Sequence, residues 1–165
     1  MRKIMLLLST LLFITVGNSF AAPSNTLDQQ QIAIGIVGGN VTDNYYLEQK
    51  VSNNITIGIQ YINSDVDCYG QLDLASDTGK GPKLIIGNRN FDAGGSTVYV
   101  GAAINSPMTE GVDGYVVGLA GKDLQELQMG IINEINDSIF IDLNYRIVKH
   151  NGTDHGIGVG LGCRI

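Results

Sequence analysis

Apolar residues recur at every second position through the last part of the chain, from Glu126 to Ile165. Between Ile139 and Ile147 the odd positions are aliphatic or tyrosine, and the even positions include aspartate, asparagine and arginine. Between Gly156 and Ile165 apolar residues alternate with glycine and finally arginine. A period of two is typical of β-strands with one apolar face, and the short Asn136-Asp137 link indicates a hairpin. The segment therefore predicts three consecutive antiparallel strands.

The same alternation, separated by short polar turns, extends back to Ile32. No stretch has the length of a crossover helix, so the pattern favours an all-β, up-and-down antiparallel barrel over a βαβ fold. We expect about ten strands, or eight if the weak second strand and its neighbour merge, with a loop at 105–113. The expected strands are 32–37, 45–51, 55–61, 68–74, 82–89, 97–104, 115–120, 127–135, 139–147 and 156–165.

The residues that alternate with the apolar positions show which face of the barrel is outside. They are mostly glycine, alanine, threonine and amides, and only 16% of the chain is charged, against about 25% in soluble domains. A face exposed to water would carry many lysines and glutamates. The pattern therefore predicts a transmembrane β-barrel with its apolar face toward lipid, while a soluble secreted or periplasmic barrel is the alternative. Aromatic residues near strand ends, expected to form part of an interfacial belt, are Tyr61, Phe91, Tyr115 and Tyr145.

The N-terminus has the features of a secretory signal peptide. Arg2 and Lys3 precede an apolar run at 4–16, and small residues precede a cleavage site after Ala21. The run is shorter than the roughly 20 residues that span a bilayer, which disfavours a membrane anchor. We expect a signal peptide at 1–21, a flexible lead-in at 22–30 and a single barrel domain at 31–165.

Charged residues on the non-apolar face are expected to point into the lumen. Three are positive and three negative, so they can pair and avoid the cost of isolated buried charge. A barrel of about ten strands is barely wider than its side chains can fill. We therefore favour a polar plug over a gated or very small pore. The predicted lumen network consists of Asp73, Lys83, Arg89, Glu134, Asp142 and Arg146.

Other chemistry has weaker signals. The net charge of −6 opposes a main role in nucleic-acid binding. His150 and His155 flank a polar turn with no activated nucleophile nearby, so we expect no enzyme activity. The acidic stretch Asp65–Asp77 lacks the glycine spacing of a calcium loop, and Gly156–Gly162 lacks the lysine of a phosphate loop. We expect no metal and no cofactor.

The two cysteines are expected to be free. Cys68 shares its face with Leu72 and Leu74, and Cys163 shares its face with Leu161. They lie on the fourth and tenth expected strands, which are not neighbours in a closed barrel. A disulfide needs Cα atoms within about 7 Å, so we expect both thiols to face lipid.

The segment Leu127–Gly130, the hairpin strand Ile139–Arg146 and the glycine-rich final strand resemble the YfaZ-type small outer-membrane β-barrels of Gram-negative bacteria. The resemblance is one of pattern across the mature chain, and it implies an outer-membrane location without a defined biochemical activity. We expect a monomer with a structural, envelope or surface-interaction role and a plugged lumen. Its expected partners are outer-membrane lipid and the outer-membrane assembly machinery. The alternatives are a narrow channel for small solutes and a soluble barrel that binds an apolar ligand.

Overall fold

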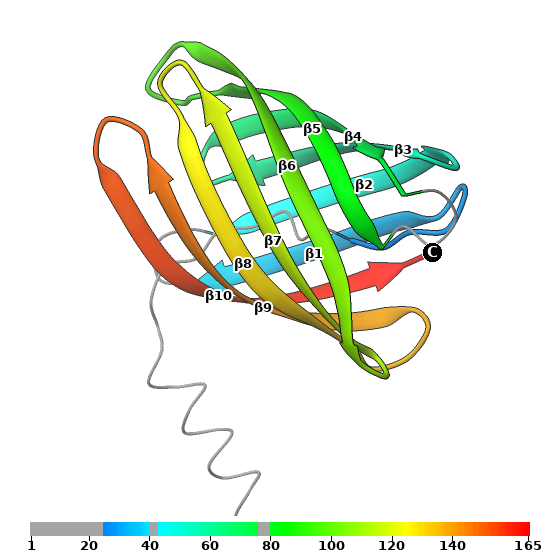
Figure 1. Cartoon of the computed structure of the whole chain (residues 1–165). Helices are drawn as coiled ribbons and strands as arrows, with labels where there is room; N and C mark the ends of the chain where they lie inside the picture. The colour runs from blue at the N-terminus through cyan, green and yellow to red at the C-terminus, as the bar shows by residue number, and fades with distance from the viewer. Residues whose placement is uncertain (1–24, 40–42, 76–79) are drawn as a thin grey trace, which may run out of the picture.

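The computed structural model describes residues 25–39, 43–75 and 80–165, and these form a closed barrel of antiparallel strands (Figure 1). Each strand pairs with the next, and β1 closes the barrel by pairing with β10. The predicted up-and-down barrel of ten strands is thus confirmed, and the eight-strand alternative is wrong. The strands are β1 (Ile32–Gly39), β2 (Asn44–Ser52), β3 (Ile55–Ile62), β4 (Asp65–Asp73), β5 (Gly81–Asn90), β6 (Ser96–Thr109), β7 (Val112–Gly121), β8 (Gln125–Glu134), β9 (Ile139–Lys149) and β10 (Thr153–Arg164).

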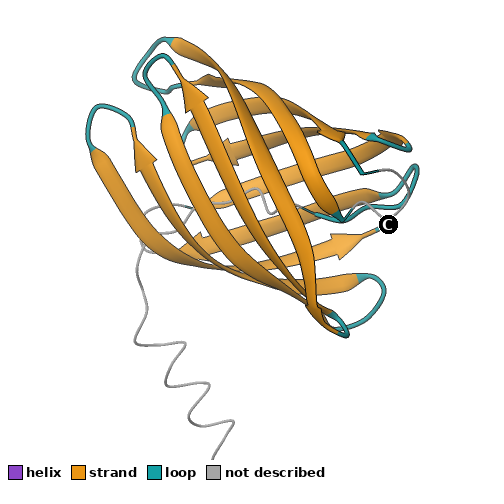
Figure 2. Cartoon of the chain, viewed as in Figure 1, coloured by secondary structure: helices purple, strands orange, loops and turns teal. Residues whose placement is uncertain are grey.

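Strands and short turns account for almost all of the described chain (Figure 2). Among the described residues there is no helix with the length and hydropathy needed to cross a membrane. The start of β1 and the end of β10 lie at one end of the barrel, where Ile32 and Ile165 exchange backbone hydrogen bonds of 2.8 and 2.9 Å. We call this end the terminal rim. The turns that follow β3, β5, β7 and β9 lie at the other end, the opposite rim.

The loop predicted at 105–113 is wrong in extent. Strand β6 continues to Thr109, and its pairing with β7 includes Asn105↔Tyr115 and Pro107↔Asp113. The register shifts between Pro107 and Thr109. A proline is tolerated in a strand at such an irregularity, because the ladder there no longer requires its missing donor.

The polarity of the barrel is inverted relative to a soluble protein. Aliphatic side chains cover its outside, and Val98 and Ile86 are 65% and 60% exposed. Charged side chains lie inside, and Lys83 and Arg146 are only 2% and 1% exposed. An apolar exterior around a polar interior is the arrangement of a transmembrane barrel, whose outer surface is solvated by lipid.

One strand does not follow the predicted faces. Tyr115, Val117 and Leu119 point into the lumen, whereas Val116 is 42% exposed on the outside. From Gly114 to Gly121 both faces of β7 are apolar or small, so composition over this stretch does not distinguish them. Pairing decides the orientation, because Val117 lies opposite the inward-facing Ala103 of β6. Tyr115 is consequently not part of an interfacial belt.

The remaining expected belt residues and the cysteines lie as follows. Tyr61 is 45% exposed on the outer face, Tyr145 is half-buried on the same face, and Phe91 belongs to a turn at the opposite rim. Cys68 on β4 and Cys163 on β10 are free and exposed, as predicted. The two strands are separated around the barrel and do not pair.

Candidate functional site

A chain of alternating charges crosses the lumen among β4, β5, β8 and β9. The Arg89 guanidinium lies 2.7 Å from the Asp67 carboxylate and 3.0 Å from that of Glu126. Glu126 also pairs with Arg146. All four side chains are at least nine-tenths buried. Because each buried charge has an opposite neighbour, the cost of removing it from water is offset by pairing and hydrogen bonding.

A second cluster lies on β2, β4 and β5. Asp73 pairs with Lys50, and its other oxygen lies 3.6 Å from the Lys83 ammonium. Nearby, the Glu48 carboxylate accepts hydrogen bonds from Tyr69 at 2.7 Å and Gln71 at 2.9 Å. The cluster thus connects β2, β4 and β5 through side-chain contacts.

Two smaller groups complete the lumen. Asp142 accepts hydrogen bonds from Asn144 and, at 2.9 Å, from the Tyr115 hydroxyl. At the terminal rim Arg164 pairs with Glu134 at 2.6 Å. In the described part of the chain, no three His, Cys, Asp or Glu side chains are grouped as a metal site would require.

The structure places five of the six predicted lumen residues inside the barrel and the sixth at its rim, and most of the six do not pair with one another. Asp73, Lys83, Arg89, Asp142 and Arg146 are buried, whereas Glu134 lies at the rim with 34% of its side chain exposed. Only Asp73 and Lys83 form an ion pair with each other. The others pair with residues that the sequence analysis did not select, namely Asp67, Glu126 and Arg164, while Asp142 is hydrogen-bonded to neutral groups.

A signal for the missed residues was present in the alternation. Glu126 shares its face with Gln128, and Asp67 shares its face with Tyr69 and Asp73. Lys50 and Glu48 follow the same rule in β2. Extension of the expected strands 68–74 and 127–135 by one residue would have placed Asp67 and Glu126 in the lumen, and alternation within 45–51 would have placed Glu48 and Lys50 there.

Two residues of the lead-in at 22–30, which is predicted to be flexible, are buried in the barrel. Asn25 and Leu27 are 3% and 4% exposed. The Asn25 amide donates to Glu48, and its backbone oxygen accepts from the Lys83 ammonium at 2.8 Å. Asn25 therefore supplies hydrogen-bond partners to two buried charges, Glu48 and Lys83, which lowers the cost of burying them. Residues 1–24, which include the predicted signal peptide, lie outside the described residues.

In five strand pairs, β1–β2, β3–β4, β5–β6, β7–β8 and β9–β10, an aromatic residue lies directly opposite a glycine and its ring covers that glycine. In each pair the ring lies over the glycine, and a Cβ added there would come within 2.2–2.6 Å of a ring atom. The glycine is required because no other residue leaves space for the ring. The pairs are Gly35↔Tyr46, Gly58↔Tyr69, Gly87↔Tyr99, Tyr115↔Gly130 and Phe140↔Gly162.

In three of these hairpins the ring crosses the glycine strand to reach the strand beyond it. Tyr69 of β4 passes over β3 and donates to Glu48 of β2. Tyr99 of β6 donates at 2.8 Å to Asp67 of β4. Tyr115 of β7 makes the corresponding bond to Asp142 of β9. Because glycine has no side chain in the way, three tyrosine hydroxyls can cross to the next strand and donate hydrogen bonds to three buried carboxylates.

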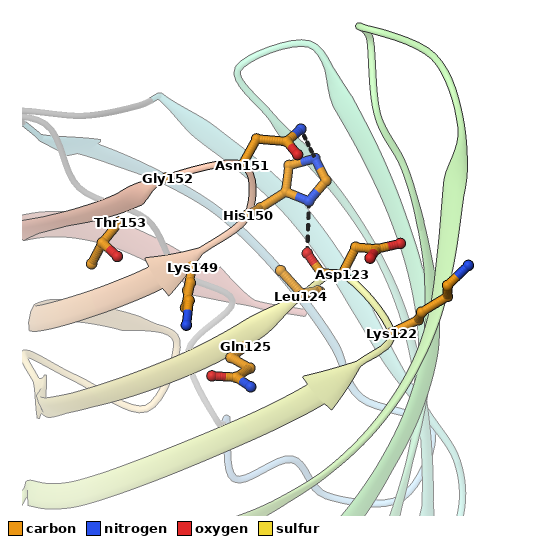
Figure 3. Close-up of a pocket in the computed structure, with 9 residues that line it drawn as sticks. All are labelled: Lys122, Asp123, Leu124, Gln125, Lys149, His150, Asn151, Gly152 and Thr153. Carbon is orange, nitrogen blue, oxygen red and sulfur yellow. Dashed lines mark hydrogen bonds between the residues drawn. The ribbon is translucent and has the colours of Figure 1, made fainter.

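A pocket of about 460 Å³ lies at the opposite rim between the turns that follow β7 and β9 (Figure 3). The His150 ring is fixed there, because its Nδ1 donates to the Asp123 carbonyl oxygen at 2.8 Å. The Phe91 ring stacks on it with centroids 3.8 Å apart. His150 thus connects three turns, which is a structural role. The pocket is lined by Lys122, Asp123, Leu124, Gln125, Lys149, His150, Asn151, Gly152 and Thr153.

No family model matches the chain, and no curated protein matches it in sequence. Among solved structures, a de novo designed transmembrane β-barrel is similar over 86% of this chain and all of that chain, with 12% identity and a TM-score of 0.44. The N-terminal barrel domain of Pseudomonas aeruginosa OprF covers the same shares at 10% identity and a TM-score of 0.38. Neisserial surface protein A covers 82% of this chain and 92% of its own, at 12% identity and a TM-score of 0.32. Similarity at this level indicates neither a shared family nor a shared function.

Proposed function

We propose that this chain is a small integral outer-membrane β-barrel with a structural, envelope or surface-interaction role and no enzymatic activity. The observation that carries the proposal is the inverted polarity, with aliphatic side chains outside and ion pairs inside. In water such an exterior would associate or aggregate, whereas in a bilayer it is solvated. Export by the predicted signal peptide would deliver the chain to the outer membrane.

The lumen is proposed to be a plug rather than a channel. Most of its charges form ion pairs across the interior, Glu48 and Asp142 are hydrogen-bonded to neutral groups, and Asn25 and Leu27 fill part of the space. A conducting pore would instead need a continuous water-filled path between the two rims. Planar-bilayer recording is expected to show no steady conductance, and a stable, sizeable single-channel current would establish the narrow-channel alternative.

The finer family assignment remains a proposal. It rests on the sequence pattern of residues 127–146 and the glycine-rich final strand, which resemble YfaZ-type proteins. A monomer whose partners are outer-membrane lipid and the assembly machinery fits a barrel that closes on itself. The soluble alternative that binds an apolar ligand has less support, because the lumen is lined by charged and amide side chains.

Fractionation of cells that express the full chain tests the membrane location. We expect the protein in the outer-membrane fraction, extracted only by detergent. We also expect it to migrate differently on gels before and after boiling, because a closed barrel resists unfolding in detergent. Recovery in the soluble periplasmic fraction without detergent would reject the proposal.

A further inference from the structure

The lysines and arginines of the described residues divide into two groups. Six make ion pairs with a carboxylate within 4.0 Å, five of them in the lumen and one, Lys80, with Asp113 near the terminal rim. Lys122 and Lys149 make no such ion pair with any described residue. Both are exposed, and both line the pocket at the opposite rim (Figure 3). Within the part of the chain that the structure describes, the lysines without an ion pair are therefore gathered at one place.

Strand register places this pocket at the edge of the lipid-facing surface that borders the opposite rim. Gln125 of β8 lies opposite Lys149 of β9, which lies opposite Thr153 of β10. These three side chains form one exposed polar row across neighbouring strands. Side chains directly opposite each other in a sheet are about 5 Å apart, so one small headgroup can contact the whole row.

The row next to the polar row consists of Leu127, Ile147 and the exposed His155, and beyond it the same three strands present an apolar wall. Met129, Tyr145 and Ile157 share one row across β8, β9 and β10. Ile131, Leu143 and Val159 share the next, and these three are 39–50% exposed. Acyl chains packed on this wall would place a lipid headgroup at the level of Lys149. Lysines near the end of a membrane-spanning segment typically extend to that level.

We propose that the pocket at the opposite rim binds the phosphate-bearing headgroup of an anionic membrane lipid. Lys122 and Lys149 line the pocket on separate sides, and Figure 3 shows their ammonium groups directed apart. On their long flexible side chains they would turn to the headgroup and supply charge-assisted hydrogen bonds to phosphate oxygens. Gln125, Asn151 and Thr153 supply neutral donors. This inference rests on the proposed membrane location, because the acyl chains occupy the lipid-facing wall.

The acidic and imidazole groups at the pocket are compatible with an anion. Asp123 lies beside Lys122, but Figure 3 shows its carboxylate directed away from Lys149. The His150 ring is engaged by the Asp123 carbonyl oxygen, the Asn151 amide and the Phe91 ring. The turn that carries Asn151 and Gly152 is therefore held in place before a ligand arrives.

The proposal can be tested with the folded mature protein in octyl glucoside micelles. Dihexanoyl phosphatidylglycerol, dihexanoyl phosphatidylcholine and inorganic phosphate are titrated separately, and NMR shifts of the backbone amides at 122–125 and 149–153 report binding. We expect phosphatidylglycerol to bind at least about tenfold more tightly than either other probe. Lys122→Gln and Lys149→Gln should each weaken it about fivefold, and the double variant about 25-fold.

Two matched variants keep the test decisive. Lys80→Gln makes the same change in charge at the terminal rim and should leave phosphatidylglycerol affinity within about twofold of the parent. Lys122→Arg with Lys149→Arg keeps both charges and should retain binding. Equal affinity for the two lipids, or unchanged affinity in the double glutamine variant, would overturn the inference while leaving the membrane location intact. If inorganic phosphate bound as tightly as phosphatidylglycerol, the pocket would be a site for free phosphate, and the proposal of a lipid headgroup would be overturned.

Discussion

The ring of Tyr69 lies over Gly58 on the neighbouring strand, so that a Cβ on Gly58 would be 2.4 Å from Tyr69 Cζ. The two residues are directly opposed in the β3–β4 hairpin. Beyond the glycine, the tyrosine hydroxyl reaches Glu48 of β2. One contact therefore connects close backbone packing to the satisfaction of a buried carboxylate, and four other strand pairs repeat the contact between ring and glycine.

Replacing Gly58 by alanine is expected to destabilise the barrel by about 1–3 kcal/mol, because the ring must move and no space is available. Urea unfolding in detergent micelles, followed by far-UV circular dichroism because the chain has no tryptophan, measures the free energy of unfolding. Gly70 of the same hairpin is the matched control, since a Cβ added there meets nothing within 4 Å. Gly70→Ala should change stability by no more than about 0.5 kcal/mol. Equal effects of the two substitutions would contradict the packing argument.

Tyr69→Phe keeps the ring over Gly58 but removes the hydroxyl that donates to Glu48. A hydrogen bond to a charged, buried group contributes about 1.5–3 kcal/mol, and Gln71 still donates to the same oxygen, so we expect a loss near the lower value. Tyr45→Phe on the outer face is the control and should be neutral. A Tyr69→Phe barrel as stable as its parent would show that the hydroxyl bond adds nothing.

Glu126 is shared by Arg89 and Arg146, so its removal should cost more than removal of either arginine's contact alone. Arg146→Ala is expected to lower the free energy of unfolding by about 3–5 kcal/mol, the scale for breaking a buried ion pair, or less if water enters the lumen. Glu126→Gln should exceed it, because two buried arginines then lose their common partner. Unfolding midpoints of both variants in micelles, with Glu110→Gln in an exposed turn as control, test the order. An unchanged midpoint for Arg146→Ala would indicate that this side chain faces solvent.

The packed lead-in gives a prediction about local order. Asn25→Ala removes the amide that donates to Glu48 while keeping the backbone oxygen that accepts from Lys83. We expect faster amide hydrogen exchange at residues 26–31 and little change in the strands, because local opening is cheaper than global unfolding. The control is Asn53→Ala, in the exposed turn between β2 and β3 at the terminal rim, which should leave amide exchange at 26–31 unaltered. Exchange at 26–31 that is already unprotected in the parent would contradict the packing of Asn25.

The two thiols should remain free during export and folding. Cys68 and Cys163 face outward on strands that do not pair, and a bridge between them would require Cα atoms within about 7 Å. Mass spectrometry of non-reduced, detergent-folded protein is expected to show two thiols per chain. A Cys68–Cys163 crosslink at high occupancy would be incompatible with the closed strand order.

The sequence by itself determined the strands and, for nearly all of them, their faces. Side chains in a strand alternate between two sides, so an apolar residue at every second position identifies both the strand and its lipid-facing side. This is why Ile139–Ile147 and Lys83–Arg89 were oriented correctly. It is also why β7 was not, since Tyr115 and Val116 are both apolar and the alternation is lost there.

Only the tertiary structure decided which lumen charges meet. Alternation assigns Arg89, Glu126 and Arg146 to one face, but it does not give their heights along the barrel axis or their positions around it. Those depend on the register of every strand pair and on barrel closure. The partners of Glu48 were likewise inaccessible, because Tyr69 reaches it across an intervening glycine and Asn25 reaches it from outside the strands. Long-range pairing of buried charge is a property of the closed barrel, and no local pattern encodes it.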